Sequence, residues 1–143
     1  MVPVSQLLAD KGHDLYRLRP EDPVIDAIQL MADKSVGALL VMEGDRLVGI
    51  LSERDYARKV ILKGRSSKDT PISAIMTPAP LVTVSPNSRT KECMRLMTDW
   101  RIRHLPVVEG DKVVGMLSIG DLVRSIIEGL EGEVQQLKQY IAG

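Results

Sequence analysis

Short apolar runs and amphipathic segments follow one another along the chain in an order that occurs twice. In the first round, apolar runs at residues 15–18, 38–42 and 47–51 accompany a segment at 24–31 whose apolar side chains fall on one helical face. Glu-Gly-Asp between two β-rich runs predicts a hairpin, and apolar spacings of three and four predict an amphipathic helix. A second helix is expected to begin after Ser52. The pattern therefore predicts the order β-α-β-β-α.

The second round repeats the first at a distance of 66 residues. Residues 39–52 fall on residues 105–118, and Asp55 falls on Asp121, with no gap needed between residues 18 and 56. A unit of roughly 60 residues is marginally stable alone, so the two copies are expected to pack as one body with an internal pseudo-twofold axis. The predicted fold class is α+β: two β-α-β-β-α repeats and a C-terminal helix.

The repeat predicts four segments along the chain. Repeat 1 covers residues 1–64, a polar linker rich in Gly, Ser and Pro covers 65–71, repeat 2 covers 72–128, and a helical tail covers 129–143. Within the repeats, Asp22 is expected to be the N-cap of the first amphipathic helix, with Pro23 at its first position. Ser88 stands at the matching place in the second copy.

The tail has an apolar seam of coiled-coil type. Its apolar residues are spaced 4, 3, 4, 3 and 4 apart: Val123, Ile127, Leu130, Val134, Leu137 and Ile141. Gly129 and Gly132 weaken the helix by about 1 kcal/mol each relative to Ala. A helix with such a seam must dock against something, and we predict a homodimer. The alternative is a tail that folds back onto its own subunit.

Composition excludes several classes of function. Nineteen Lys and Arg balance nineteen Asp and Glu, and aromatic residues make up 3% with no Phe, so a nucleic-acid partner is not expected. The single cysteine, Cys93, cannot form an intrachain disulfide, which fits a reducing cytoplasm. The N-terminal residues have neither the pattern of a signal peptide nor that of a membrane span. We therefore expect a cytoplasmic protein with no membrane partner.

The main chemical signal is the doubled motif Gly-h-h-Ser-x-x-Asp, in which h is apolar, at residues 49–55 and 115–121. A Ser at a helix N-cap lies beside free backbone N–H groups and the positive end of the helix dipole, which together suit an anion. An Asp three residues later suits a sugar diol as a double acceptor. The combination points to a nucleotide. The alternative is a capping box, in which Ser and Asp only satisfy helix-end donors.

Basic residues precede a buried strand in the second copy only. Arg103 and His104 could neutralise a phosphate there; alternatively, the arginine is solvated and His104 is an ordinary strand-edge histidine. The first copy has no charge at residues 35–38 and offers Arg54 and Arg58 beside its own motif. The two copies therefore cannot be equivalent binding sites.

The sequence resembles a tandem cystathionine-β-synthase (CBS) domain pair, or Bateman module, of the stand-alone bacterial type. The resemblance rests on the doubled motif together with Arg-His-Leu-Pro-Val-Val at residues 103–108, Ile-Ser-Ala-Ile-Met-Thr at 72–77 and Thr-Val-Ser-Pro at 83–86. It implies a three-stranded sheet and two helices per repeat. It also implies two clefts between the repeats that hold an adenosine compound such as AMP, ADP, ATP, NAD or S-adenosylmethionine.

The resemblance also implies roles for individual residues. The two aspartates would bind the ribose hydroxyls, the two serines would approach the phosphates, an apolar group would line the adenine pocket, and basic residues would contact phosphate. The ligand set is Asp121, Asp55, Ser118, Ser52, Thr77, Pro78, Val82, Met116, Pro106, Arg103, His104 and Arg54. Residues 8–13 of the first copy occupy the place that residues 76–79 hold in the second.

No catalytic or metal-binding pattern accompanies these residues. His13 and His104 are the only histidines, no cluster has zinc-like spacing, and there is no Walker A loop or Gly-x-Gly-x-x-Gly. Cys93 lies in an apolar helical stripe, where packing is the more frequent role. We predict a regulatory sensor of adenine nucleotides, not an enzyme. The alternative is a protein-interaction module with vestigial clefts, whose tail binds an unidentified protein.

Overall fold

The computed structural model describes residues 2–12 and 14–142, so His13 lies outside the described residues. The chain divides into two compact units. Unit 1 comprises Met1–His13, Val82–Glu109 and Val114–Gly143, and unit 2 comprises Asp14–Leu81 and Gly110–Val113. The units do not follow the order of the repeats, because the segment before the first strand of repeat 1 belongs to the unit built from repeat 2.

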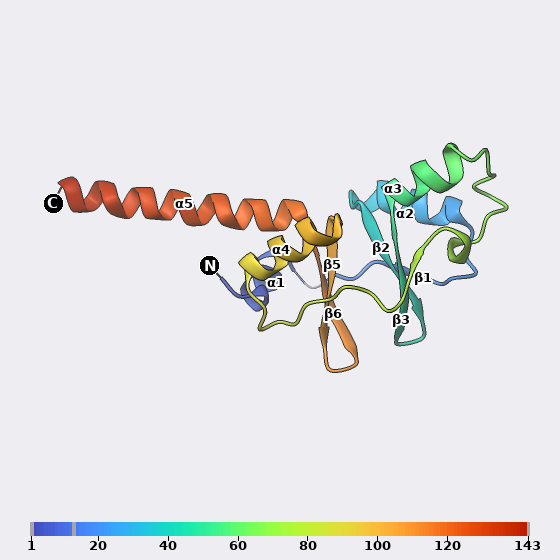
Figure 1. Ribbon diagram of the computed structural model, residues 1–143, viewed down its shortest axis with the longest axis horizontal. Coiled ribbons are helices and arrows are strands. Elements are labelled where there is room, and N and C mark those ends of the chain that lie inside the picture. Colours follow the sequence, from blue (N-terminus) through green and yellow to red (C-terminus); the bar gives the residue numbers. More distant parts are fainter. Residues whose placement is uncertain (1, 13, 143) are drawn as a thin grey trace. The chain divides into compact units, whose positions relative to one another are not determined.

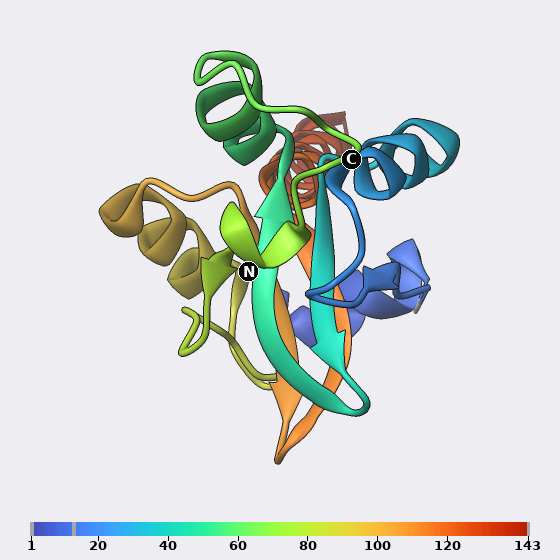
Figure 2. The same ribbon diagram turned by 90° about the vertical axis from the view of Figure 1, so that its right-hand side faces the viewer.

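Unit 2 is a four-stranded sheet in the order β1-β2-β3-β4, with the long central strands visible in Figure 2. Strand β1 is parallel to β2, β2 is antiparallel to β3, and β3 is antiparallel to β4. The elements are β1 (Arg17–Leu18), α2 (Val24–Lys34), β2 (Ala38–Glu43), β3 (Arg46–Ser52), α3 (Glu53–Tyr56), the π-helix η1 (Ala57–Ile61), the 3₁₀ helix η2 (Ile72–Ala74) and β4 (Thr77–Pro78). The predicted hairpin of repeat 1 is confirmed, and the strand expected at 15–18 is shortened to two residues.

Unit 1 is built around the hairpin of β5 and β6. Its elements are α1 (Val4–Lys11), α4 (Thr90–Trp100), β5 (His104–Glu109), β6 (Lys112–Ser118) and α5 (Ile119–Ala142). The repeat of the 15–18 run falls at residues 81–84 and predicts a strand there, but this prediction is wrong: of these residues only Val84 pairs, in a single parallel bridge with Val107. Pro80 and Pro86 flank this run and have no N–H to donate to a longer ladder.

Each unit has its own apolar core, which a helix and two strands of one copy share with a segment from the other. The core of unit 1 includes Leu7 and Leu8 from α1 with Cys93, Leu105 and Leu117. The core of unit 2 is formed in the same way from α2, β2 and β3 together with η2. Burial of these side chains is the main stabilising contribution in each unit.

The segments that each unit takes from the other copy are held by equivalent backbone contacts. In unit 1, Pro3 bridges Arg89, and the Val4 N–H donates to the Ser88 carbonyl at 2.7 Å. In unit 2, Pro23 bridges Pro71. Positions 23 and 89 differ by the repeat distance, so both units dock the exchanged segment at the same place, just before the amphipathic helix. Figure 1 shows α1 with α4, the β5–β6 hairpin and the start of α5 in unit 1.

The N-caps predicted for the two amphipathic helices are wrong by one residue. Helices α2 and α4 have Pro23 and Arg89 at the N-cap, with no side-chain cap from either. The Asp22 carboxylate instead accepts the Arg19 N–H at 2.9 Å, and the Ser88 hydroxyl accepts the Ser85 N–H at 3.1 Å. Each predicted cap thus closes the turn that leads into its helix, because its oxygen reaches the N–H three residues earlier.

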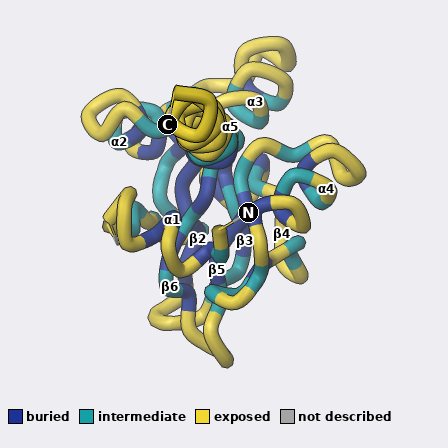
Figure 3. The backbone as a smooth tube through the Cα atoms, turned by 90° about the vertical axis from the view of Figure 1, so that its left-hand side faces the viewer, coloured by how far each residue is buried: buried dark blue, intermediate teal, exposed yellow. Residues whose placement is uncertain are grey.

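Helix α5 runs without a break from repeat 2 through the tail, past both of its glycines. Its first turn is buried at Asp121 and Leu122, whereas residues 127–142 are exposed (Figure 3). The tail therefore does not fold back onto its own unit. Among the described residues, no helix has the length and apolar character that crossing a membrane requires.

Candidate functional site

Both Ser-x-x-Asp motifs form capping boxes at the start of a helix. The Ser52 hydroxyl accepts the Asp55 N–H at 3.2 Å, and the Asp55 carboxylate accepts the Ser52 N–H at 3.0 Å. At the start of α5, the Ser118 hydroxyl accepts the Asp121 N–H at 3.2 Å, and the Asp121 carboxylate accepts the Ser118 N–H at 2.8 Å. The capping alternative is therefore confirmed as geometry. Each cap uses Oδ2 of the carboxylate, so Oδ1 of each aspartate takes no part in the cap.

The carboxylate of Asp121 is bound by a lysine from the opposite end of the sequence. The Lys11 ammonium lies 2.8 Å from Oδ2 of Asp121 and donates to the Met116 carbonyl at 2.6 Å. Asp121 is 9% exposed, whereas the side chain of Lys11 is 33% exposed, so the carboxylate is buried and the ammonium is partly in contact with solvent. On the other side, the Arg124 guanidinium lies 3.6 Å from Oδ1. The N-terminus of α5 thus carries a carboxylate that forms ion pairs with Lys11 and Arg124.

Burial and hydrogen bonding act in opposite directions on the titration of Asp121. Burial raises the pKa of this carboxyl, but the hydrogen bonds from Lys11 and Ser118 outweigh it, so the pKa lies below its ordinary value. Asp121 is therefore ionised at neutral pH, as a double acceptor for hydroxyl groups must be.

His104 lies in the same electrostatic environment. Burial lowers the pKa of its imidazole, the positive charges of Lys11 and Arg103 lower it further, and the Asp121 carboxylate partly opposes them. The net shift is below the ordinary value, so His104 is neutral at pH 7 and adds no charge there in the structure as it stands. Among the described residues, Lys11 and Arg103 place positive charge near His104, and Lys11 and Arg124 place it on Asp121.

The carboxylate of Asp55 has a lysine partner of local origin. The Lys59 ammonium, one helical turn later, lies 3.3 Å from Oδ1 and donates to the Ile75 carbonyl at 3.0 Å. Asp55 is 16% exposed at its side chain and Lys59 is 45% exposed. The π-helix that follows α3 places Lys59 on the same face as Asp55. This pair is more open to solvent than the pair at Asp121 and is correspondingly weaker.

The glycine that opens each motif allows the exchanged segment to come close. A Cβ at Gly49 would lie 2.6 Å from the Met76 sulfur and 2.9 Å from the Thr77 carbonyl oxygen, and a Cβ at Gly115 would lie 2.5 Å from a methyl of Leu8. The strand therefore needs glycine at these two places because residue 77 and helix α1 pass directly over them. The same two segments supply the Ile75 carbonyl that accepts from Lys59 and the Lys11 ammonium that pairs with Asp121.

The predicted ligand set divides between the units. Thr77 and Pro78, which are expected to line an adenine pocket with Val82 and Met116, pair with Ile50 and Gly49 on β3 in unit 2. They therefore lie in the unit of Ser52, Asp55 and Arg54. The repeats exchange their leading segments, so the place expected for residues 76–79 in unit 1 is taken by α1.

The remaining predicted residues belong to unit 1 with Ser118 and Asp121. The Arg103 carbonyl accepts the Ile119 N–H at 2.8 Å, which ties this exposed arginine to the start of α5. Pro106 is buried in β5, Val82 is half-buried against the core, and Met116 offers its carbonyl to Lys11. Sequence reasoning missed both lysines. Lys59 could have been found from its i+4 spacing to Asp55, whereas nothing local indicated Lys11.

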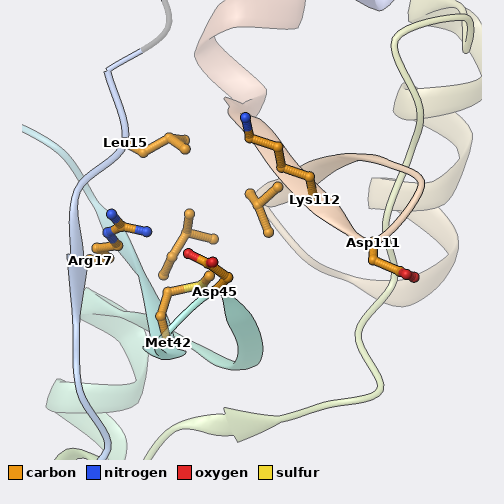
Figure 4. A pocket seen from close by; sticks show the side chains of 8 residues that line it. Leu15, Arg17, Met42, Asp45, Asp111 and Lys112 are labelled. Atoms are coloured by element: carbon orange, nitrogen blue, oxygen red, sulfur yellow. The ribbon is translucent and has the colours of Figure 1, made fainter.

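A separate pocket of about 600 Å³ lies in unit 2 (Figure 4). Its lining is mixed in character and holds none of the predicted ligand residues: Leu15, Arg17, Leu40, Met42, Asp45, Asp111, Lys112 and Val113. Two acidic and two basic side chains leave it without net charge. It adds nothing to the site at either aspartate.

Comparison with known proteins identifies the fold. The CBS domain family matches residues 8–62 and 72–128. A solved protein with CBS domains from Burkholderia ambifaria MC40-6 is 52% identical with a TM-score of 0.85, covering 89% of this chain and 95% of that one. The CBS domain protein PAE2072 from Pyrobaculum aerophilum, solved in complex with AMP, is 26% identical with a TM-score of 0.78, covering 92% and 99%.

A curated relative adds a second line of similarity. The mitochondrial CBS domain-containing protein CBSX3 of Arabidopsis thaliana is 46% identical over 127 residues, which are 86% of this chain and 62% of CBSX3. The chain thus spans less than two thirds of that relative. The doubled motif, the mixed α and β units and the paired family matches lead to one assignment: the chain belongs to the CBS domain family and carries a tandem pair of these domains.

Proposed function

We propose that the chain is a regulatory sensor that binds an adenine nucleotide at the Ser-x-x-Asp motifs and transmits the binding event to a partner. The observation that carries the proposal is the Asp121 carboxylate: ionised, 9% exposed, and set at a helix N-terminus with a cation on it. A carboxylate in that position suits ribose hydroxyls, and the basic groups around it suit phosphate. The AMP complex of PAE2072 supports an adenine nucleotide as the ligand class.

Lys11 gives this proposal a mechanism of signalling. A ribose that binds Asp121 replaces the Lys11 hydrogen bond, and the freed ammonium becomes available to the phosphate. Lys11 ends α1 and Asp121 begins α5, so the exchange acts on the contact between two helices of unit 1. Coupling of this kind is typically worth about 1–3 kcal/mol. A regulatory role also agrees with the Burkholderia relative, which is regarded as a signal-transduction protein.

The proposal also covers assembly and location. We propose that the protein is a cytoplasmic homodimer without a catalytic role, and that a protein partner recognises its nucleotide-bound state. AMP, ADP, ATP and NAD are the nucleotides considered, with S-adenosylmethionine as a further adenosine compound.

Calorimetric titration and thermal unfolding with AMP, ATP, NAD and S-adenosylmethionine test the proposal. A specific ligand at 100 times its Kd should add about 2.7 kcal/mol to the free energy of unfolding. The matched control is the double variant Asp55→Asn/Asp121→Asn, which keeps the side-chain shape and removes the charge. Its response to the same ligand should be lost.

The alternative is an interaction module in which both lysines occupy their aspartates permanently. The exposed seam of α5 favours this second candidate. A wild-type chain that responds to none of the four compounds up to millimolar concentration would establish it, as would a double variant that responds as strongly as the wild type.

A further inference from the structure

The exposed part of α5 carries a heptad pattern whose apolar seam is uncovered. Assigning Val123 to position d of the heptad places Leu130 and Leu137 at d, and Ile127, Val134 and Ile141 at a. All six are exposed, from 41% at Val123 to 76% at Ile141. Leu122, one residue before the seam, is fully buried. The helix thus changes within one residue from packing on its own unit to presenting an apolar stripe to solvent, and such stripes mark interfaces.

The residue types at a and d indicate how many helices the seam joins. Position a holds only β-branched residues, namely Ile127, Val134 and Ile141, and position d holds leucine at 130 and 137. β-branched side chains at a with leucine at d favour a parallel two-stranded coiled coil over trimers and tetramers. This pattern specifies a second copy of the same helix as the partner.

The flanking charges select the direction of that second helix. Positions e are Arg124, Glu131 and Lys138, and Glu133 is at g. In a parallel pair, g faces e of the next heptad, so Glu133 faces Lys138 of the other copy, twice by symmetry. In the antiparallel pair that keeps the seams aligned, e faces e and g faces g. That arrangement sets Arg124 against Lys138, Glu131 against Glu131 and Glu133 against Glu133, all of like charge.

The outward positions agree with the same arrangement. Gly129 and Gly132 fall at c and f, on the side away from the seam, and a Cβ at either would meet nothing within 4 Å. Gln135, Gln136 and Gln139 fill the remaining outer positions of the last turns. Apolar side chains in this part of the helix thus concentrate on the seam.

We propose that residues 123–141 of α5 form a parallel, in-register, two-stranded coiled coil with the same residues of a second copy. This names the surface and orientation of the homodimer proposed above and does not depend on nucleotide binding. One consequence concerns the site. Because α5 begins at Ile119, a parallel coiled coil holds the Asp121 motifs of both copies at the same end of the paired helices.

Disulfide cross-linking at the seam tests the orientation directly. In a parallel pair, Leu137→Cys places the two new thiols opposite each other at the same d layer, within reach of a disulfide. In the antiparallel pair, residue 137 lies opposite residue 127, and the two thiols are about 15 Å apart. We expect a cross-linked dimer from Leu137→Cys under mild oxidation and none from the outward control Gln136→Cys. Cys93 is buried with its pKa raised to about 11, so the wild type should stay uncross-linked.

Adding Leu130→Glu to Leu137→Cys should abolish the cross-link, because it puts a charge in the seam. Failure of Leu137→Cys to cross-link faster than Gln136→Cys overturns the proposal, even in a chain that is dimeric through another surface. Such a result would leave the nucleotide titrations unaffected, so the two proposals fail separately.

A charge reversal gives a second and independent measurement. In the parallel pair, Lys138→Glu sets Glu against Glu133 twice and should raise the dimer Kd about three- to tenfold in sedimentation equilibrium. The double variant Glu133→Lys/Lys138→Glu should restore it. In the antiparallel pair, Lys138→Glu would instead face Arg124 and tighten the dimer. A tighter dimer, or no change in Kd, would overturn the parallel arrangement.

Discussion

Helices α3 and α5 begin with the same motif and the same capping box. The lysine that pairs with the aspartate, however, comes from a different part of the chain in each. Asp55 is paired with Lys59, four residues away on its own helix. Asp121 is paired with Lys11, which is 110 residues away in sequence and enters unit 1 on the exchanged helix α1. The first pair forms between neighbouring helical turns, and Lys59 is also bound to the Ile75 carbonyl. The second pair reports on whether α1 is docked, and this makes the Asp121 site the better candidate for a switch.

The two exchanged segments differ in how rigidly they pack against the glycine of the motif. Over Gly49 the close neighbours include backbone, the Thr77 carbonyl oxygen at 2.9 Å, besides the Met76 sulfur at 2.6 Å, whereas over Gly115 the three nearest atoms all belong to the Leu8 side chain. A carbonyl in a β-pairing has a fixed position, and a leucine side chain can rotate. Unit 2 is therefore expected to hold its segment rigidly and unit 1 to hold α1 with more freedom.

The largest effect on stability is expected when a methyl group is added at Gly49 or at Gly115. Gly49→Ala places a Cβ against the Thr77 carbonyl and should lower the free energy of unfolding by about 2–3 kcal/mol, whereas Gly115→Ala should cost about 1 kcal/mol. Urea denaturation of both variants measures this. Gly129→Ala, on an open helix face, is the control and should be neutral or stabilising. Equal losses for the two strand glycines would show that Leu8 is as rigid as β4.

The next effect concerns ligand affinity at the two aspartates. Asp121→Ala should weaken nucleotide binding more than Asp55→Ala does, because Arg103 and His104 belong to the unit of Asp121. Loss of hydrogen bonds to a charged acceptor costs about 1.5–3 kcal/mol, or roughly 10- to 150-fold in Kd. Calorimetric titration of both variants checks this, with their unfolding curves recorded to confirm that they are folded. An Asp121→Ala titration curve that matches the wild type would exclude Asp121 as a ligand residue.

Much of each unit followed from local patterns in the sequence. The apolar runs around Glu-Gly-Asp gave both hairpins, and the Ser before each second helix gave its cap. The exchange of segments could not be obtained in this way. A repeat at a distance of 66 residues aligns residues 8–13 with residues 76–79, but it does not state which copy each segment packs on. Lys11 was therefore missed, because only long-range packing brings it to Asp121, and the pairing of Thr77 with β3 was not foreseen for the same reason.

Lys11 offers a smaller effect of opposite sign. Lys11→Met removes the cation that competes for Asp121 while keeping an apolar stem of similar length, so adenosine should bind about three- to tenfold more tightly at this site. Adenosine is the sensitive probe because it has no phosphate to lose a contact with Lys11. Lys59→Met is the matched control in unit 2 and should leave binding at Asp121 unchanged. Weaker binding of adenosine to Lys11→Met would show that the lysine holds the site together instead of competing for it.

The smallest effect is a change in the pH dependence of stability. Burial, with Lys11 and Arg103, lowers the pKa of His104 in the folded chain below its ordinary 6.5. As pH falls below about 6.5, the unfolded chain therefore takes up a proton before the folded chain does, and stability falls until the folded pKa is reached. The slope is bounded by one proton, about 1.4 kcal/mol per pH unit. Relative to wild type, His104→Gln should lose this part of the slope between pH 6.5 and 5, whereas His13→Gln should retain it. Denaturation curves at half-unit pH steps measure the difference, and an unchanged slope in His104→Gln would mean that the folded chain accepts the proton as readily as the unfolded one.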